Sequence, residues 1–235
     1  MIKLFKLLVL CLSLVLSNLL VAQSDSLTLS KADSSDTNCL NWIAPVWYFP
    51  SRFETVHGIA IGLGDLQKDS CNSTVNGLKV EILGLGVGVG FLNSNTISED
   101  SATHASLIDN PVRRTKNQVN GFNISLFGTI DDLRVNGVSL GGLAQYIDFV
   151  QGVQITGVNS RISGKISGVQ LSGAYNNAII CHGIQMSLLG NKAFDLKGIQ
   201  IGLFNNSEIT RGFQFGLWNV NEKRSLPFIN WNFKD

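Results

Sequence analysis

Residues 197–219, KGIQIGLFNNSEITRGFQFGLWN, contain nearly the same phrase twice: GIQIGLFN from Gly198 and GFQFGLWN from Gly212. Aligned on its leading glycine, this phrase recurs nine times, at Gly58, Gly77, Gly121, Gly137, Gly152, Gly168, Gly183, Gly198 and Gly212. The first two spacings are 19 and 44 residues, and the later ones are 16, 15, 16, 15, 15 and 14. A period this regular predicts a repeat architecture with about 15 residues per unit.

Each phrase alternates between two kinds of residue. In the copy at Gly198, the apolar residues Ile199, Ile201 and Leu203 alternate with Gly198, Gln200 and Gly202. Strict alternation is typical of a β-strand with one buried face, and two glycines per phrase disfavour a helix. We therefore expect the apolar residues to fill the interior and the glycine and glutamine residues to face outward.

Two all-β fold classes can use this repeat. In a β-solenoid of about 15-residue coils, each repeat holds a strand of seven or eight residues and a shorter second segment. Successive coils would stack at about 4.8 Å, and Asn159, Asn205 and Asn219 would form a side-chain ladder at one turn. The alternative is an outer-membrane β-barrel with one strand per repeat. The phrases are shorter than the roughly 9–11 residues of a spanning strand, so the solenoid is favoured.

The chain divides into a leader, a spacer and a repeat domain. Residues 1–22 have basic residues, an apolar run and a final Ala22, which predicts a secretory signal peptide. Residues 23–40 are rich in Ser and Asp and predict a disordered polar spacer. Residues 41–235 form the β-repeat domain.

Aromatic and proline-containing segments bound the repeats. We expect residues 41–57 and 221–235 to be caps, because the open edges of a solenoid would otherwise recruit other strands. The 44-residue spacing contains a polar insertion, which predicts a long loop at 93–118.

The charge balance and the scarcity of catalytic motifs argue against nucleic-acid binding, metal binding and catalysis. The formal net charge is +1, from 18 basic and 17 acidic residues, so no nucleic-acid partner is expected. The histidines and cysteines are scattered, and neither a phosphate loop nor a nucleophile elbow is present in the sequence. We therefore expect no enzyme, no metal and no cofactor. In an exported protein, Cys39 and Cys71 can form a disulfide.

Glutamine occupies the third position in five successive phrases, as Gln154, Gln170, Gln185, Gln200 and Gln214. On a solenoid these residues would occupy one outward position and form a ladder. Their amides can bond along the stack in a purely structural role. A flat polar ladder can also bind a glycan or a partner strand, and the sequence leaves both roles open.

Five stretches, VNGFNISLF, VQGVQITGVN, LKGIQIGLFN, TRGFQFGLWN and the closing RSLPFINWNF, resemble bacterial surface-repeat proteins built on units like VNGVQIGLVN. The resemblance covers the chain from Gly58 to its C-terminus. It implies an exported cell-envelope protein, at the cell surface, in the outer membrane or in the periplasm, and supplies no catalytic residues.

The functional expectation is an exported, non-enzymatic cell-envelope protein with a structural or adhesive role. Its expected partners are an envelope glycan or another surface protein, and association with a membrane is compatible with it. The alternative function is that of an integral outer-membrane barrel acting as a pore.

Overall fold

The computed structural model describes residues 46–48, 55–62, 73–82, 115 and 117–233. All of them lie within one compact unit, Cys39–Asp235. The predicted signal peptide and spacer, Cys39, Cys71 and the predicted loop up to residue 114 lie outside the described residues.

The described residues form eleven β-strands. They are β1 (Val46–Tyr48), β2 (Thr55–Gly62), β3 (Ser73–Glu81), β4 (Asn117–Ser125), β5 (Ile130–Gly141), β6 (Ala144–Thr156), β7 (Asn159–Ser172), β8 (Tyr175–Ser187), β9 (Gly190–Ile201), β10 (Phe204–Val220) and β11 (Ser225–Asn232). The described part of the chain holds no helix that could cross a membrane.

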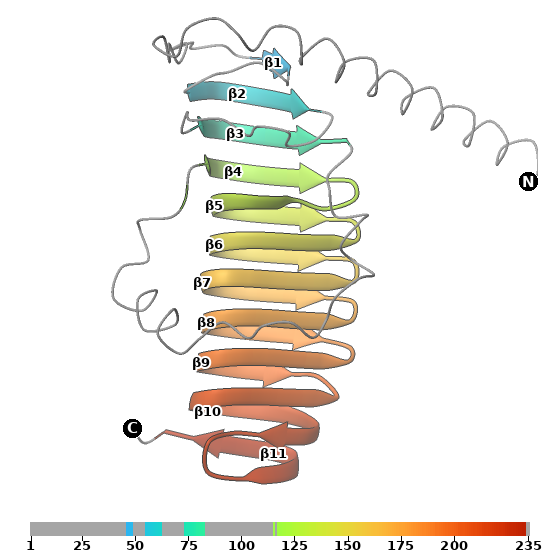
Figure 1. Cartoon of the computed structure of the whole chain (residues 1–235), viewed down its shortest axis with the longest axis vertical. Coiled ribbons are helices and arrows are strands. Elements are labelled where there is room, and N and C mark those ends of the chain that lie inside the picture. The colour runs from blue at the N-terminus through green and yellow to red at the C-terminus, as the bar shows by residue number, and fades with distance from the viewer. Residues whose placement is uncertain (1–45, 49–54, 63–72, 83–114, 116, 234–235) are drawn as a thin grey trace, which may run out of the picture. The chain divides into compact units, whose positions relative to one another are not determined.

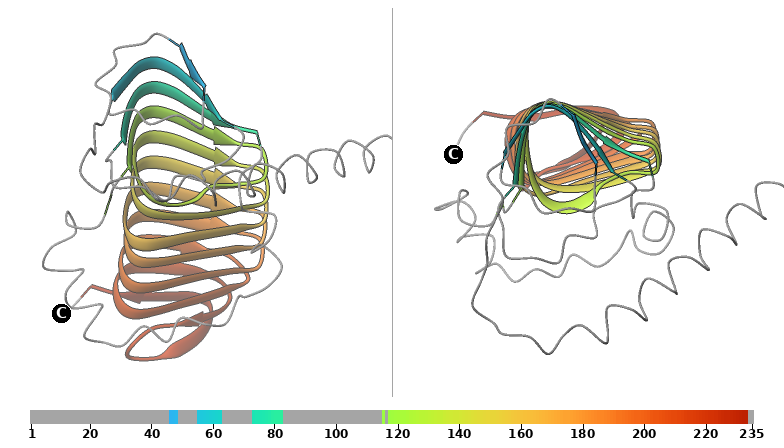
Figure 2. Two further views of the ribbon diagram at one scale, coloured as in Figure 1. Left: turned by 45° about the horizontal axis from the view of Figure 1, so that its top comes forward. Right: turned by 90° about the horizontal axis from the view of Figure 1, so that it is seen from above.

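The strands follow one another through a single sheet in chain order (Figure 1). Neighbouring strands from β1 to β10 are parallel, and the glycines that open the phrases pair with one another from coil to coil. Viewed along the stack, successive coils overlie one another (Figure 2). The β-solenoid is thus confirmed. The barrel alternative is wrong, because consecutive strands of such a barrel run antiparallel.

The strands from β3 to β10 are longer than the seven or eight residues expected. In β6 to β10 the phrase and the second segment join into one strand of 12 to 17 residues. One of these strands, β7, is irregular at one point, which helps it to follow the coil. In β7 the register against β6 shifts between Ile162 and Lys165, and a bulge of this kind bends a strand.

The two ends of the described sheet differ in direction. The three residues of β1 lie in the segment predicted as the first cap and extend the sheet in parallel. The eight residues of β11 lie in the second predicted cap, turn back and pair antiparallel with β10. The capping role of both segments stays a prediction.

Part of the interior is an apolar seam, formed by the residue two positions before each phrase glycine from Gly58 to Gly198, whereas Thr210 takes this position before Gly212. These buried residues are Val56, Val75, Val119, Val135, Val150, Ile166, Cys181 and Leu196. Apolar residues of the second segments, including Ile147, Ile162 and Ala178, belong to the same cluster. The seam places a buried apolar residue at the same position of each coil from β2 to β9.

The predicted assignment of the two faces of the phrase is wrong. Gln200 has no exposed surface, whereas Ile201 is 36% exposed and Leu203 is 39% exposed. A sequence that alternates with a period of two assigns its residues to the two faces of a strand, but it does not determine which face is buried. The amides take the inner face because, as described below, equivalent amides of successive coils bond to one another.

The phrase glycines from Gly77 to Gly212 leave no room for a side chain. All nine phrase glycines have φ between 134° and 156°, a region that other residues rarely adopt. A Cβ on Gly183 would lie 1.9 Å from the carbonyl oxygen of Gly168 in the preceding coil. Glycine at this position therefore permits the close stacking of coils.

Replacing Gly183 with alanine is expected to destabilise the fold by more than about 4 kcal/mol, because both the backbone conformation and the contact with Gly168 become strained. Thermal unfolding followed by circular dichroism measures this change. Ser167→Ala, a side chain one residue before the neighbouring glycine, is the control and should change stability little. A Gly183→Ala protein that melts like the wild type would contradict the argument.

Candidate functional site

The predicted glutamine ladder lies inside the coils. Gln185 Nε2 donates to Gln170 Oε1 at 2.8 Å, Gln200 to Gln185 at 2.8 Å, and Gln214 to Gln200 at 2.9 Å. Gln154 occupies the same register row, but its amide makes no hydrogen bond within the described residues. All five side chains are fully buried. A ligand on the outer surface therefore cannot touch this ladder, and the outward placement expected from the sequence is wrong.

Each bonded glutamine also spans the coil to the opposite wall. The Nε2 atoms of Gln185, Gln200 and Gln214 lie 3.4, 3.3 and 2.9 Å from the backbone oxygens of the second segment. The amide nitrogen thus uses one hydrogen along the stack and the other across it. A buried polar group costs little free energy when it is bonded in this way.

A second, asparagine ladder lies at the turn. Asn176 Nδ2 donates to Asn191 Oδ1 at 2.9 Å, Asn191 to Asn205 at 2.8 Å, and Asn205 to Asn219 at 2.7 Å. The ladder predicted from the sequence correctly included Asn205 and Asn219. It omitted the other two asparagines and included Asn159, which lies one register position away. Alignment by phrase failed here because the turn is one residue shorter in the last two coils.

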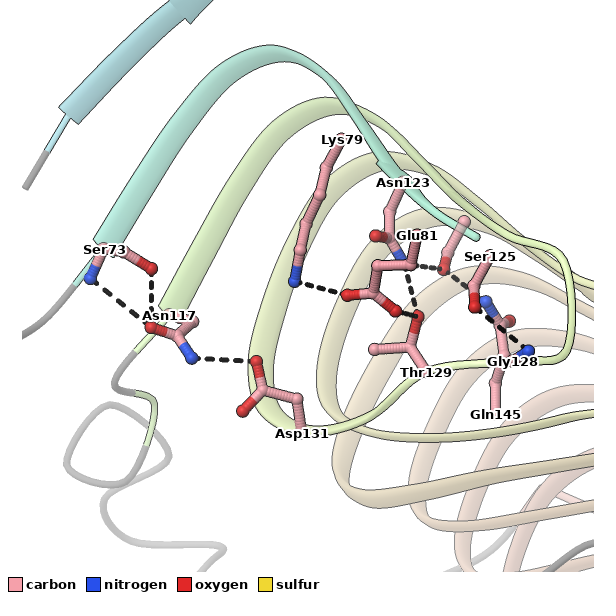
Figure 3. Close-up of polar contacts among 11 residues, drawn as sticks. Ser73, Lys79, Glu81, Asn117, Asn123, Ser125, Gly128, Thr129, Asp131 and Gln145 are labelled. Carbon is pink, nitrogen blue, oxygen red and sulfur yellow. Dashed lines mark hydrogen bonds and ion pairs between the residues drawn. The ribbon is translucent and has the colours of Figure 1, made fainter. Parts of the chain in front are cut away.

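The interior of the first coils contains charges instead of glutamine. Lys79 stands in the row of the glutamines, and its Nζ lies 2.7 Å from Glu81 Oε1 (Figure 3). The other oxygen, Glu81 Oε2, accepts a hydrogen bond from Thr129 Oγ1 at 3.0 Å. The two charged side chains are only 6% and 2% exposed. This ion pair is therefore a buried structural feature and not a surface for substrate.

Hydrogen bonds continue this network into the next coils. Asn123 Nδ2 donates to Thr129 Oγ1 at 3.2 Å and to Ser139 Oγ at 3.1 Å, and Gln145 Nε2 donates to Ser139 Oγ at 2.9 Å. A separate chain seen in Figure 3 ends on Asp131, whose carboxylate accepts from Asn117 Nδ2 at 2.8 Å. These interior polar groups hold one coil to another.

Two titratable side chains, Cys181 and His182, lie at or next to the apolar seam and have shifted pKa values. Burial, helped by the charge of Asp195, raises the pKa of the Cys181 thiol to about 12, so the thiol stays protonated. Burial, together with Lys165 and Lys197, lowers the pKa of His182. Within the described ranges no three His, Cys, Asp or Glu side chains are grouped as a metal site would require.

The outer side of the phrases is the first notable surface, which we call the apolar face. It consists of the second and fourth residues of every phrase, in two register rows, continued by Trp231 and Ile229 of β11. The rows are Ile59, Leu78, Phe122, Val138, Val153, Val169, Ile184, Ile199, Phe213 and Trp231, and Ile61, Val80, Ile124, Leu140, Ile155, Leu171, Met186, Ile201, Phe215 and Ile229. None of these twenty side chains is buried.

The second surface is a groove of about 420 Å³ at the turn between phrase and second segment, which we call the corner groove. One wall is a row in which Gly190 lies between Tyr175 and Phe204, with Trp218 one coil further. The other wall is a register row of polar side chains, Arg161, Asn177, Lys192 and Asn206. The groove thus combines aromatic rings, amides and two cations.

Reasoning from the sequence did not find the corner groove. Its residues belong to five strands, β6 to β10, and to the variable second segments rather than the repeated phrase. The role of Gly190, against which the Tyr175 ring lies, becomes visible only when the residues of the coils before and after it are known. The aromatic residues that follow several phrases, such as Tyr175, Phe204 and Trp218, were the available signal.

Comparison with known proteins gives no match: no family model, no curated protein and no solved structure is significantly similar to this chain.

Replacing Gln200 with alanine is expected to cost about 2–4 kcal/mol of stability, because it leaves a cavity and removes the ladder partners of Gln185 and Gln214. Urea unfolding of the wild type and the variant measures the loss. Gln151→Ala, an exposed glutamine of β6, is the matched control and should stay within about 0.5 kcal/mol of the wild type. Equal effects at the two positions would show that the ladder has no energetic role.

Replacing Glu81 with glutamine is expected to destabilise the protein by about 3–5 kcal/mol, because the buried Lys79 ammonium loses its counter-charge. The double variant Lys79→Met/Glu81→Gln removes both charges and retains an acceptor for Thr129, so it should recover most of the loss. Urea unfolding measures the free energy of unfolding of the wild type and both variants, and the comparison is valid when its slope against urea concentration is unchanged. A double variant as unstable as the single one would contradict this account.

Proposed function

We propose that this chain is an exported, non-enzymatic protein of the bacterial cell envelope with a structural role, and that it associates with a second copy of itself through the apolar face. The observation that carries the proposal is the apolar face, whose twenty side chains form two rows without a polar interruption. Exposed apolar surface of this extent is characteristic of interaction sites.

The size and regularity of the apolar face favour a second copy as its partner. A standard protein interface takes about 20–30 residues from each side, and the face supplies twenty. Its side chains repeat at the strand spacing of about 4.8 Å, so two copies present the same spacing to each other. Two sheets can then pack face to face with interdigitated side chains, as in a β-sandwich. A two-fold axis would generate such a self-complementary contact.

The chemistry of the rows supports the same partner. Neither row contains a charged residue, so pairing would bury no charge on the face itself. Aromatic packing is already present at the C-terminal end, where the rings of Phe213 and Phe215 lie with centroids 5.9 Å apart. The Phe213 ring also meets Phe233 edge-on at 5.0 Å.

The remaining parts of the proposal rest on the sequence and on the interior chemistry. The leader at residues 1–22 supports export, and the likeness of the phrases to bacterial surface repeats supports a place in the envelope. The buried Cys181 thiol and the paired Glu81 carboxylate support a non-enzymatic role, because neither can reach a substrate.

Sedimentation of the purified chain is expected to show a concentration-dependent dimer. Ile155→Lys/Met186→Lys places two charges on the apolar face, where both side chains are exposed, and should give a monomer with an unchanged circular dichroism spectrum. Ile209→Lys adds a charge at an exposed position outside the two rows and should leave the dimer intact. The register row of Ile209 already contains a lysine, Lys165, so the coils tolerate this side chain in that row.

Two results would overturn the proposal. The first is a wild type that stays monomeric at all concentrations and floats with phospholipid vesicles, which would assign the face to a membrane. The second is an Ile209→Lys variant that dissociates as readily as the double variant, which would mean that added charge alone prevents association.

A further inference from the structure

We propose that the corner groove binds an acidic polysaccharide that carries a carboxylate on every second sugar and lies along the solenoid axis. The proposal is independent of self-association, because the groove lies beyond the turn that ends each phrase and not on the apolar face.

The aromatic wall suits a sugar chain. Tyr175 and Phe204 are 47% and 57% exposed, and Gly190 between them contributes no side chain. The backbones of these two residues are therefore two coils apart, about 10 Å. The Tyr175 ring lies against Gly190, where a Cβ would come within 3.2 Å of two ring carbons. Flat aromatic rings pack against the C–H faces of pyranoses, while hydroxyl groups at the sugar edges remain free to bond. One coil spacing is close to the length of one sugar in an extended chain.

The polar wall sets the chemical class of that chain. Arg161, Asn177, Lys192 and Asn206 alternate between cation and amide, one per coil. No Asp or Glu lines the groove, and none of these four side chains bonds to another described residue. Arg161 and Lys192 are thus available to anions. Arginine can hold a carboxylate through two parallel hydrogen bonds, and asparagine both donates to and accepts from hydroxyls.

The spacing of the cations narrows the class further. Arg161 and Lys192 are two coils apart, so a chain with one sugar per coil presents every second sugar to a cation. Single-stranded nucleic acid also stacks on aromatic rings, but it carries a charge on every nucleotide, and this groove offers two cations along four coils. A polysaccharide with alternating neutral and acidic sugars matches better.

The test measures binding to the full chain by calorimetry. The probe is a hyaluronan oligosaccharide, whose carboxylates lie on alternate sugars. The comparison ligands are its carboxyl-reduced neutral form, an oligogalacturonate with a carboxylate on every sugar, and an oligothymidylate. Hyaluronan should bind, and the reduced form should bind at least about tenfold more weakly, because the charge-assisted bonds are lost. Oligogalacturonate and oligothymidylate should also bind more weakly than hyaluronan.

Variants separate the groove from general charge. Arg161→Gln/Lys192→Gln should abolish the preference for the acidic form, and Tyr175→Ala should weaken binding of both forms. Lys165→Gln/Lys197→Gln removes the same net charge elsewhere on the coils and should leave binding unchanged. Circular dichroism confirms that each variant is folded.

Several results would overturn the inference. They are equal binding of the acidic and reduced forms, equal or tighter binding of oligogalacturonate or oligothymidylate, no binding of hyaluronan, and an equal loss in the control pair. None of them bears on whether the protein dimerises.

Discussion

The register of the last coils, β7 to β10, depends on hydrogen bonds between identical amides in successive coils. A buried glutamine such as Gln200 is satisfied only when the coil before it and the coil after it place the same residue at the same height. A slip of one residue would turn the amides out of the interior and leave their partners unbonded. The phrase glycines reinforce this register, because the backbone of one coil occupies the space that a side chain of the next would need. Register and interior chemistry therefore determine each other.

Much of the architecture follows from the sequence because the repeat supplies its own internal comparison. The spacing of the phrase glycines predicts parallel coils in register, and the glycines do pair from Gly58 to Gly212. The period of two within each phrase predicts strands. The length of the strands was underestimated, because a bulge lets one strand continue around the bend where a break was expected.

The inner and outer faces could not be assigned from alternation alone, but the variation between repeats held a usable signal. The residue just before the phrase glycine changes freely among polar types, as in Gln151, Ser167 and Lys197, which suits an exposed row. The third residue is glutamine in five consecutive phrases, although any polar residue would suit water. Identity, rather than polarity, is what an amide ladder demands. The asparagine ladder and the corner groove were harder to foresee, because they depend on turn lengths and on which residues become neighbours across coils.

The polar interior has a consequence for the outside of the molecule. The third residue of each phrase, glutamine in the last five, occupies the inner face, so the apolar residues on either side of it remain on the surface, where only another body can cover them. Pairing of two apolar faces would bury them and leave the corner grooves open around the turn, one on each copy. In such a dimer, a long polysaccharide bound in one groove would be held at a high effective concentration near the second groove. Weak single contacts between sugars and half-exposed side chains would then suffice for firm attachment, so a structural and an adhesive role can reside in the same coils.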